Sequence, residues 1–381
     1  NRRRGLIGGF FTQKEKNMKK LILPAVLALS LITGSAAADV RVYVNGVRID
    51  EETILTDGRT YIPLRAVSEA LGAEVGWDDA SKSAFITFSE DDAVSKIVEN
   101  VSPSVVAVIG NYISGSESSK FNNPTAHGTG VIYKSDGHIL TNAHVVAGIT
   151  NLTVVLANGE SLPARVLYSD EVADLAVIKV DKVGLTPVVM ADGSKVFSGQ
   201  TAIAIGTPIS LSMRNTVTKG IVSGTGVALS DSYYKLLQTD TTINPGNSGG
   251  PLLNIRGELI GITSSKYVGV GIENMSFAIP VDTVRYAVSQ FEKNGKIVRA
   301  DLKMTLEQSW EAKIGLPTEK GLTVKSSRQE NIAPGSVITE VNKIRVHSTA
   351  DLNEALKNTY SGGSIEVKFT LDGQEQTVYI N

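Results

Sequence analysis

The chain has 381 residues, which suggests two or three domains, and its hydrophobic share of 42% leaves ample material for buried cores. The formal net charge is −2, so nothing indicates nucleic acid or an anionic membrane as a partner. The absence of cysteine excludes disulfides, thiolate catalysis and cysteine-ligated metal sites, but it does not indicate a reducing compartment.

The N-terminal region has the pattern of a secretory signal peptide. A positive segment leads into an apolar run from Leu21 to Ile32, and Ala36-x-Ala38 matches a cleavage signal. We therefore expect a signal peptide over 18–38, with 1–17 upstream of the true start, and export across the cytoplasmic membrane to the envelope, the periplasm or the medium. An uncleaved membrane anchor is the alternative, although the apolar run is short for a transmembrane helix.

Residues 39–90 are expected to form a small α+β domain. Alternating strands flank an Asn45-Gly46 turn, and Pro63 suits the first turn of a short helix. Thr60-Tyr61-Ile62-Pro63-Leu64-Arg65 and Gly76-Trp77-Asp78 resemble the copper amine oxidase N-terminal-like domain of exported bacterial proteins. The segment contains no His and no Cys, so soft or borderline metals lack ligands, and a stalk or surface-binding role is the expectation.

Residues 91–295 are expected to form a mainly β domain. A helical pattern over Asp92–Val101 leads into Pro103, and short apolar strands follow at regular intervals. Many short strands with Gly-rich turns favour a pair of barrels, and the polar segment 110–126 is expected to be a flexible loop. The strands are expected at Val105–Ile109, Gly130–Tyr133, Leu152–Leu156, Ala164–Tyr168, Ala176–Val180, Thr201–Ile205, Lys219–Val222 and Leu259–Thr263.

The segment Thr239 to Leu252 places a serine, Ser248, inside a glycine-flanked turn between two apolar stretches. Glycines permit positive φ, so this turn can aim backbone N–H groups at one point beside the serine hydroxyl. Acyl transfer needs this combination of a nucleophile and donors for the oxyanion. By itself the segment leaves open the alternative of a tight turn with a solvated serine.

Two upstream segments supply candidate partners for this serine. His144 follows an apolar strand that begins near Gly137, and Asp174 opens the strand that runs to Val180. Taken singly, the histidine would be a packed core residue and the aspartate a turn or cap residue. The order His, Asp, Ser is that of chymotrypsin-type enzymes and not of subtilisins or α/β-hydrolases. The chain has four histidines, so candidate bases are few.

Together these segments resemble the HtrA (Deg) family of trypsin-like serine proteases. Thr141-Asn142-Ala143-His144-Val145-Val146 and Asp174-Leu175-Ala176-Val177 look like its histidine and aspartate motifs, the Ser248 segment like its serine motif, and Phe277-Ala278-Ile279-Pro280 like its closing strand. The resemblance implies a chymotrypsin-like double β-barrel and an exported, ATP-independent serine endopeptidase for unfolded or misfolded proteins. Family members are often homotrimers, and the serine mechanism needs no cofactor.

The resemblance assigns roles residue by residue. Ser248 would attack the scissile carbonyl, His144 would transfer the proton, and Asp174 would orient the imidazole. The N–H groups of Gly246 and Ser248 would form the oxyanion hole, with Asn247 holding the turn between them.

The resemblance also points to residues of the primary specificity pocket. Ile243 lies five positions before the serine, and the opposing wall falls near Lys266 and Tyr267, where aliphatic residues are commoner in the family. Lys266 either points to solvent or makes the pocket more polar and shifts the family preference for small aliphatic residues.

Residues 301–381 resemble a shortened PDZ domain. Gly315-Leu316-Pro317 and Gly321-Leu322-Thr323-Val324 resemble its entry and carboxylate-binding loop, and Thr349 to Asn358 fits the groove helix, with Ser348 or Thr349 as cap. Such a groove adds a C-terminal peptide as a strand. The usual small helix after Ser326 is missing, so a purely structural appendage is the alternative.

Two other classes of function compete with the protease. One is a chaperone or holdase whose triad is not assembled, and the other is a surface-binding protein led by its N-terminal domain. The three triad residue types in one chain favour the enzyme.

Overall fold

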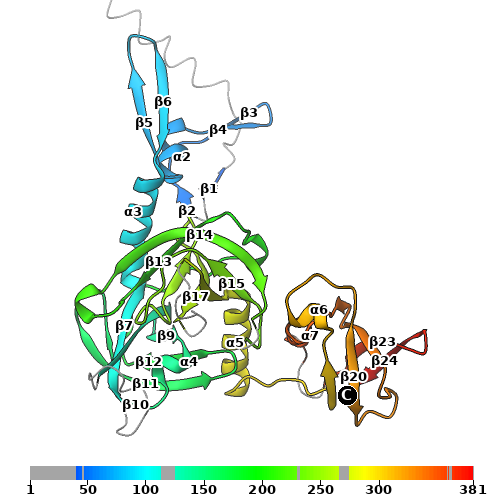
Figure 1. The fold of residues 1–381 in the computed structure, drawn as a ribbon. Coiled ribbons are helices and arrows are strands. Elements are labelled where there is room, and N and C mark those ends of the chain that lie inside the picture. Colours follow the sequence, from blue (N-terminus) through cyan, green and yellow to red (C-terminus); the bar gives the residue numbers. More distant parts are fainter. Residues whose placement is uncertain are drawn as a thin grey trace, which may run out of the picture. The chain divides into compact units, whose positions relative to one another are not determined.

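The computed structural model describes residues 40–44, 47–112, 125–229, 232–265, 274–357, 359 and 363–380. The predicted signal peptide lies outside these residues, as does most of the predicted flexible loop. The chain divides into two compact units, one ending at Ser89 and one beginning at Glu90, and each is described by itself (Figure 1). No helix in these ranges is long and apolar enough to cross a membrane.

The first unit has the α+β composition predicted from the sequence. Helix α2 (Leu64–Ala70) begins directly after Pro63 and ends two residues before Gly72. Gly72 has a φ of +85°, a backbone conformation that glycine adopts easily because it has no Cβ. Six strands form separate antiparallel pairs: β1 (Val42–Val44) with β2 (Val47–Ile49), β3 (Ile54–Thr56) with β4 (Arg59–Tyr61), and β5 (Ala73–Asp78) with β6 (Ser83–Phe88).

The first unit buries very little of its surface. Among its described residues only Ser68 and Ala73 are buried. Many large apolar side chains keep half or more of their area exposed: Tyr43, Ile54, Leu55, Tyr61, Leu64, Leu71, Trp77, Phe85, Ile86 and Phe88. A small unit with so little buried surface has a weak core of its own.

The second unit begins with helix α3 (Glu90–Val101). Three acidic residues occupy its first turn, where they interact favourably with the helix dipole. The helix buries Ala93, Ile97 and Val101, and the short 3-10 turn η1 (Ser102–Ser104) at Pro103 leads the chain into the first barrel. The helix predicted over 92–101 is therefore present and starts two residues earlier.

Two closed barrels confirm the predicted chymotrypsin-like architecture (Figure 1). The first closes in the order β10-β11-β12-β9-β8-β7, and the second in the order β13-β14-β15-β18-β17-β16. The first comprises β7 (Val105–Tyr112), β8 (Thr125–Lys134), β9 (His138–Thr141), β10 (Ile149–Val155), β11 (Ser161–Asp170) and β12 (Leu175–Val180), with helix α4 (Ala143–Val146) after β9. The second comprises β13 (Thr201–Gly206), β14 (Thr216–Val227), β15 (Leu236–Thr239), β16 (Pro251–Leu253), β17 (Leu259–Ser264) and β18 (Ser276–Pro280), with 3-10 turns η2 (Gly193–Lys195) and η3 (Leu211–Met213).

A continuous apolar core holds the two barrels against each other. It contains fully buried residues of both, among them Leu175 from the first and Ile262 from the second. Helix α5 (Val281–Asn294) closes the domain, and its Phe291 stacks on Tyr168 of β11 with ring centroids 5.4 Å apart. Because close-packed cores resist sliding, residues at the seam between the barrels are held in a defined geometry.

The C-terminal residues have a sheet and a core of their own. The sheet order is β19-β20-β21-β23-β24, with β22 paired to β21. Ser348 caps helix α7 in a capping box with Asp351, as predicted for one of two candidate residues. The elements are β19 (Met304–Glu307), α6 (Trp310–Lys313), β20 (Leu322–Ser327), β21 (Val337–Val341), β22 (Ile344–Arg345), α7 (Thr349–Leu356), β23 (Ile365–Leu371) and β24 (Gln374–Ile380).

Among the described residues, β19 forms one edge of this sheet and β20 lies inside it. The segment Gly321–Val324, expected near the peptide carboxylate, lies in β20 except for its first residue, and β20 is hydrogen-bonded to β19 on one side and β21 on the other. At this point β20 is paired on both sides, whereas β19 is paired only with β20 among the residues that the structure describes. The amide of Gln308, directly after β19, accepts a hydrogen bond from the backbone N–H of Thr349 at the start of α7, 3.1 Å away.

Candidate active site

The pairing of two strands brings His144 and Asp174 together. β9 runs antiparallel to β12 with Thr141 opposite Ala176, so the residues just after β9 lie beside those just before β12. His144 Nδ1 is 2.9 Å from both carboxylate oxygens of Asp174, and the backbone N–H of His144 donates to Asp174 Oδ1 at 3.1 Å. Two residues predicted from separate motifs thus form one unit.

The buried carboxylate of Asp174 is fully surrounded by donors. Its side chain is 2% exposed, and besides the two His144 groups it accepts from Ser264 Oγ at 2.9 Å. The Asn142 side-chain amide donates to the backbone oxygen of Asp174 at 2.9 Å and fixes its turn, where φ is +50°. An ionised carboxylate only accepts hydrogen bonds, so this contact favours the tautomer of His144 with its proton on Nδ1.

Ser248 lies on the second barrel, in the turn between β15 and β16. It is 2% exposed, and its backbone oxygen accepts from the N–H of Thr129 on β8 at 2.9 Å. The neighbouring Gly249 has φ of +84°, and a Cβ there would lie 2.2 Å from the oxygen of Thr129. The turn can therefore pack this closely against the first barrel only with glycine at this position.

The backbone around Ser248 leaves two donors unused. The oxygen of Pro245 accepts from Ile209 N–H at 2.9 Å, which turns the N–H of Gly246 to the opposite side of that peptide. Asn247 N–H donates to Asn244 O at 2.9 Å and closes the turn. Among the described residues, the N–H groups of Gly246 and Ser248 have no hydrogen-bond partner, as an oxyanion hole requires.

The hydroxyl of Ser248 points to another serine. Ser248 Oγ is 2.6 Å from Ser265 Oγ and accepts the backbone N–H of Ser265 at 3.0 Å. Within the part of the chain that the structure describes, no hydrogen bond joins Ser248 Oγ to His144. The structure thus pairs His144 directly with Asp174, whereas Ser248, the third residue of the predicted triad, is hydrogen-bonded to Ser265.

The residues predicted for the specificity pocket are only partly described. Ile243 is 5% exposed and belongs to an apolar cluster of the second barrel that includes Leu237 and Ile260. Lys266 and Tyr267 lie outside the described residues. The pocket assignment therefore stays a prediction.

Sequence reasoning missed four residues that touch the site. Thr129 Oγ1 donates to Gly246 O at 2.7 Å and accepts from the N–H of Thr207 at 3.0 Å. Ser264 and Ser265 at the end of β17 contact Asp174 and Ser248, as described above. The sequence does flank Thr129 with two glycines, Gly128 and Gly130, and this pattern could have indicated a tightly packed site. A Cβ at either glycine would clash with neighbouring atoms.

His127 is the fourth residue that the sequence did not single out. It precedes Thr129 by two positions on β8, and a Cβ on Gly246 would lie 2.8 Å from its Nε2. This nitrogen is buried without a hydrogen-bond partner among the described residues, and burial holds the pKa of the imidazole below its usual value. The buried, partner-free nitrogen and the lowered pKa both favour the neutral imidazole, and there is no room for a side chain between His127 and Gly246.

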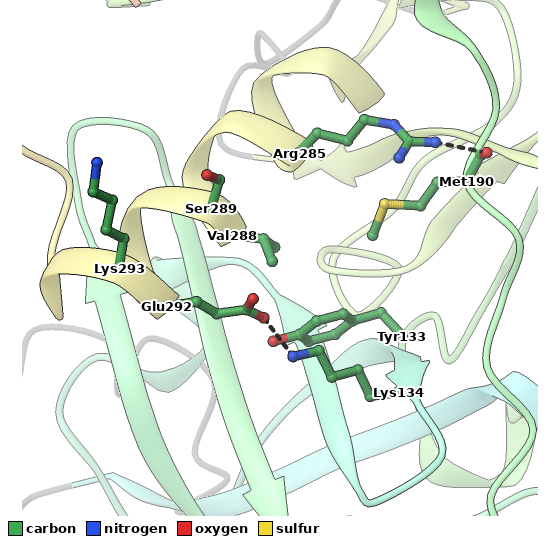
Figure 2. A pocket seen from close by; sticks show the side chains of 8 residues that line it. All are labelled: Tyr133, Lys134, Met190, Arg285, Val288, Ser289, Glu292 and Lys293. Carbon is green, nitrogen blue, oxygen red and sulfur yellow. Dashed lines mark hydrogen bonds and ion pairs between the residues drawn. The ribbon is translucent and has the colours of Figure 1, made fainter. Parts of the chain in front are cut away.

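The hollow drawn in Figure 2 is separate from these residues. It has a volume of about 560 Å³ and lies between the end of β8 and helix α5. Lys134 Nζ pairs with Glu292 at 2.6 Å across it, and Arg285 donates to the oxygen of Met190 at 2.8 Å. None of the predicted catalytic residues lines it.

Comparison with known proteins places this geometry in context. A trypsin-like peptidase domain matches residues 128–262, and a copper amine oxidase N-terminal domain matches residues 43–102. The serine protease Do-like HtrA of Lactococcus lactis is 33% identical over 74% of this chain and 81% of its own length. A probable periplasmic serine endoprotease DegP-like of Pseudomonas putida is 34% identical over 66% of this chain and 54% of its own. The solved structure of the HtrA-type protease AlgW with a tripeptide superimposes with a TM-score of 0.62 and 28% identity, over 76% of this chain and 95% of that one.

Proposed function

We propose, on the premise that the chain belongs to the HtrA (Deg) family of trypsin-like serine endopeptidases, that it is an exported, ATP-independent protease that hydrolyses unfolded or misfolded proteins. The match to the trypsin-like peptidase domain and the serine protease relatives show that the chain is a serine endopeptidase. The triad, the substrate class and the export are the parts that we add.

In the proposed mechanism, Ser248 Oγ attacks the scissile carbonyl carbon while His144 Nε2 takes its proton. The carbonyl oxygen becomes an oxyanion that accepts from the N–H groups of Gly246 and Ser248. The imidazolium then gives its proton to the leaving amine, and an acyl-enzyme remains that water hydrolyses with His144 again as base. Asp174 fixes the imidazole tautomer and stabilises its charged form throughout.

The observation that carries this proposal is the buried Asp174 carboxylate held 2.9 Å from His144 Nδ1, next to two unoccupied backbone donors at the serine turn. A buried carboxylate is costly unless it is paired and hydrogen-bonded, and here two of its three donors belong to His144, so the pairing that satisfies Asp174 also orients the imidazole.

The test is degradation of unfolded casein by the mature chain and by Ser248→Ala. We expect degradation by the wild type and none by the variant, with the thermal unfolding midpoints of the two within a few degrees of each other. Ser232→Ala is the matched control, because the hydroxyl of Ser232 bonds the backbone of Leu229 and not a residue of the proposed site, and it should degrade casein at the wild-type rate. Cleavage by a clean preparation of Ser248→Ala would refute the assignment.

A holdase is the second candidate, because the hydroxyl of Ser248 is bonded to Ser265 and not to His144. If this arrangement persists in solution, the chain would bind clients without cutting them. Suppression of client aggregation by both the wild type and Ser248→Ala, without any cleavage, would favour that function.

We further propose that the C-terminal PDZ-like residues capture the C-terminus of a peptide along β19. β19 is paired on one side only, and α7 begins beside its end, so a peptide could add as a strand between them. Titration of Ser248→Ala with a fluorescent apolar peptide tests this, with the same peptide amidated at its C-terminus as control. A lack of saturable binding to either peptide would favour a structural appendage.

Cleavage preference, assembly and location complete the proposal. Ile243, with Lys266 and Tyr267, is proposed to line the primary pocket, and a peptide-library profile that keeps a Val/Ala preference would exclude a polar pocket. A homotrimer is proposed from the family and is checked by light scattering. N-terminal sequencing of the exported protein tests cleavage after Ala38, and a retained Leu21–Ile32 segment would favour a membrane anchor.

A further inference from the structure

Consecutive serines at the end of β17 contact two of the proposed catalytic residues. Ser264 Oγ donates to Asp174 Oδ2 at 2.9 Å. Ser265 holds Ser248 Oγ through its own hydroxyl at 2.6 Å and through its backbone N–H at 3.0 Å. Because successive side chains point to opposite sides at a strand end, one short segment reaches both the acid and the nucleophile.

The two contacts of Ser265 limit what the Ser248 hydroxyl can do. A serine hydroxyl has one proton to donate and two lone pairs to accept with. One lone pair of Ser248 takes the N–H of Ser265, and the contact between the two side-chain oxygens takes either the hydroxyl proton or the second lone pair. In this arrangement His144 Nε2 has no hydrogen bond to Ser248, so it cannot take up the serine proton.

We infer that Ser265 is a positioning residue that holds Ser248 in a resting orientation, from which the hydroxyl must turn to His144 before it can attack. The inference rests on the proposed role of Ser248 as the nucleophile. The chemistry after the turn is that of the proposed mechanism, and Ser265 takes no part in it.

Burial makes this contact strong enough to matter. Ser248 is 2% exposed and Ser265 is half-buried, so solvent competes only weakly for the Ser248 hydroxyl. A neutral intramolecular hydrogen bond contributes on the order of 1 kcal/mol, which corresponds to a roughly two- to tenfold difference in the population of the free hydroxyl. Removing the Ser265 hydroxyl should raise the reactivity of Ser248 by this factor, while the backbone N–H remains.

The reactivity of Ser248 can be measured without binding a protein substrate. Diisopropyl fluorophosphate forms a bond between Ser248 Oγ and phosphorus, fluoride leaves, and His144 takes the serine proton. The second-order rate constant of this labelling, followed by mass spectrometry on the full chain, reports how available the hydroxyl is. Peptide hydrolysis by the same preparations separates an effect on kcat from an effect on KM.

Three variants test the inference, because each is expected to change the rate of labelling at Ser248 in a different way. Ser265→Ala should label roughly two- to tenfold faster than the wild type and raise kcat by a similar factor, with KM unchanged. Ser265→Thr keeps a hydroxyl and should label at nearly the wild-type rate. Ser264→Ala, the adjacent control, loses a donor to Asp174 and should label more slowly.

The outcomes separate this inference from the proposed function. If the wild type labels at Ser248 but Ser265→Ala labels at the same rate or more slowly, Ser265 has a structural role only, and the inference is overturned. If Ser265→Ala does not fold, as judged by its thermal unfolding, Ser265→Gly replaces it and must show the same acceleration. If neither the wild type nor any variant labels at Ser248, the proposed nucleophile is wrong and the inference fails with it.

Discussion

Thr129 links the two barrels at the turn that carries the proposed oxyanion donors, and its replacement by valine is the most informative single change. Its hydroxyl is fully buried, donates to Gly246 O at 2.7 Å and accepts from Thr207 N–H at 3.0 Å. Valine has nearly the same shape, so Thr129→Val removes these hydrogen bonds without opening a cavity. The carbonyl and the N–H would then be buried without partners.

The two lost hydrogen bonds set the expected decrease in the free energy of unfolding and in kcat. A buried polar group left unsatisfied costs about 1–3 kcal/mol, so the two groups together should lower the free energy of unfolding by roughly 2–6 kcal/mol. Gly246 also carries a proposed oxyanion donor, and a shift of its peptide weakens that donor. Complete loss of one donor typically costs about 100- to 1,000-fold in rate, which sets the upper limit for the fall in kcat.

The assay pairs urea unfolding with peptide hydrolysis. Thr129→Ser keeps the hydroxyl and should recover most of the activity. Thr153→Val on β10 is the control, because its hydroxyl bonds only Asn151 O at an exposed position and should contribute less than about 0.5 kcal/mol. If Thr129→Val kept wild-type stability and kcat, the hydroxyl would not support the oxyanion turn, and the reasoning would be wrong.

Three further changes test other parts of the structure. In Asp174→Asn, the asparagine tolerates the φ of +50° at this position, so circular dichroism should show an intact fold. Because the asparagine amide favours the wrong tautomer of the His144 imidazole, kcat should fall about 10⁴-fold. Gly249→Ala should destabilise by about 2–5 kcal/mol in urea unfolding, because it adds a clash to an unfavourable φ, whereas Gly159→Ala at φ of +87° in open space should cost only about 1–2 kcal/mol. Hydrogen bonding from Lys325 is the main cause that lowers the pKa of Glu307 from 4.5 to about 2. The stabilisation is therefore present above pH 4.5 and is lost as the pH falls towards 2, so the difference in unfolding midpoint between the wild type and Glu307→Gln should vanish over that window.

The sequence alone determined the fold class and the family. Short apolar strands separated by turn residues repeat along 105–263, and this local pattern predicts a β-barrel pair because strand alternation and turn chemistry are properties of neighbouring residues. The motifs around His144, Asp174 and Ser248 carried the family resemblance, which the comparisons confirm. The glycines around Ser248 indicated a tight turn for the same local reason.

Only the tertiary structure decided what surrounds these residues. Ser264 lies 90 positions from Asp174, and Thr129 lies on a different barrel from Gly246, yet each pair is hydrogen-bonded. No local pattern predicts such a contact, because it depends on strand register and on how the barrels pack. The contact of Ser265 with Ser248 arises in the same way, since a hydrogen bond requires its two atoms within about 3 Å and only the complete fold sets that distance.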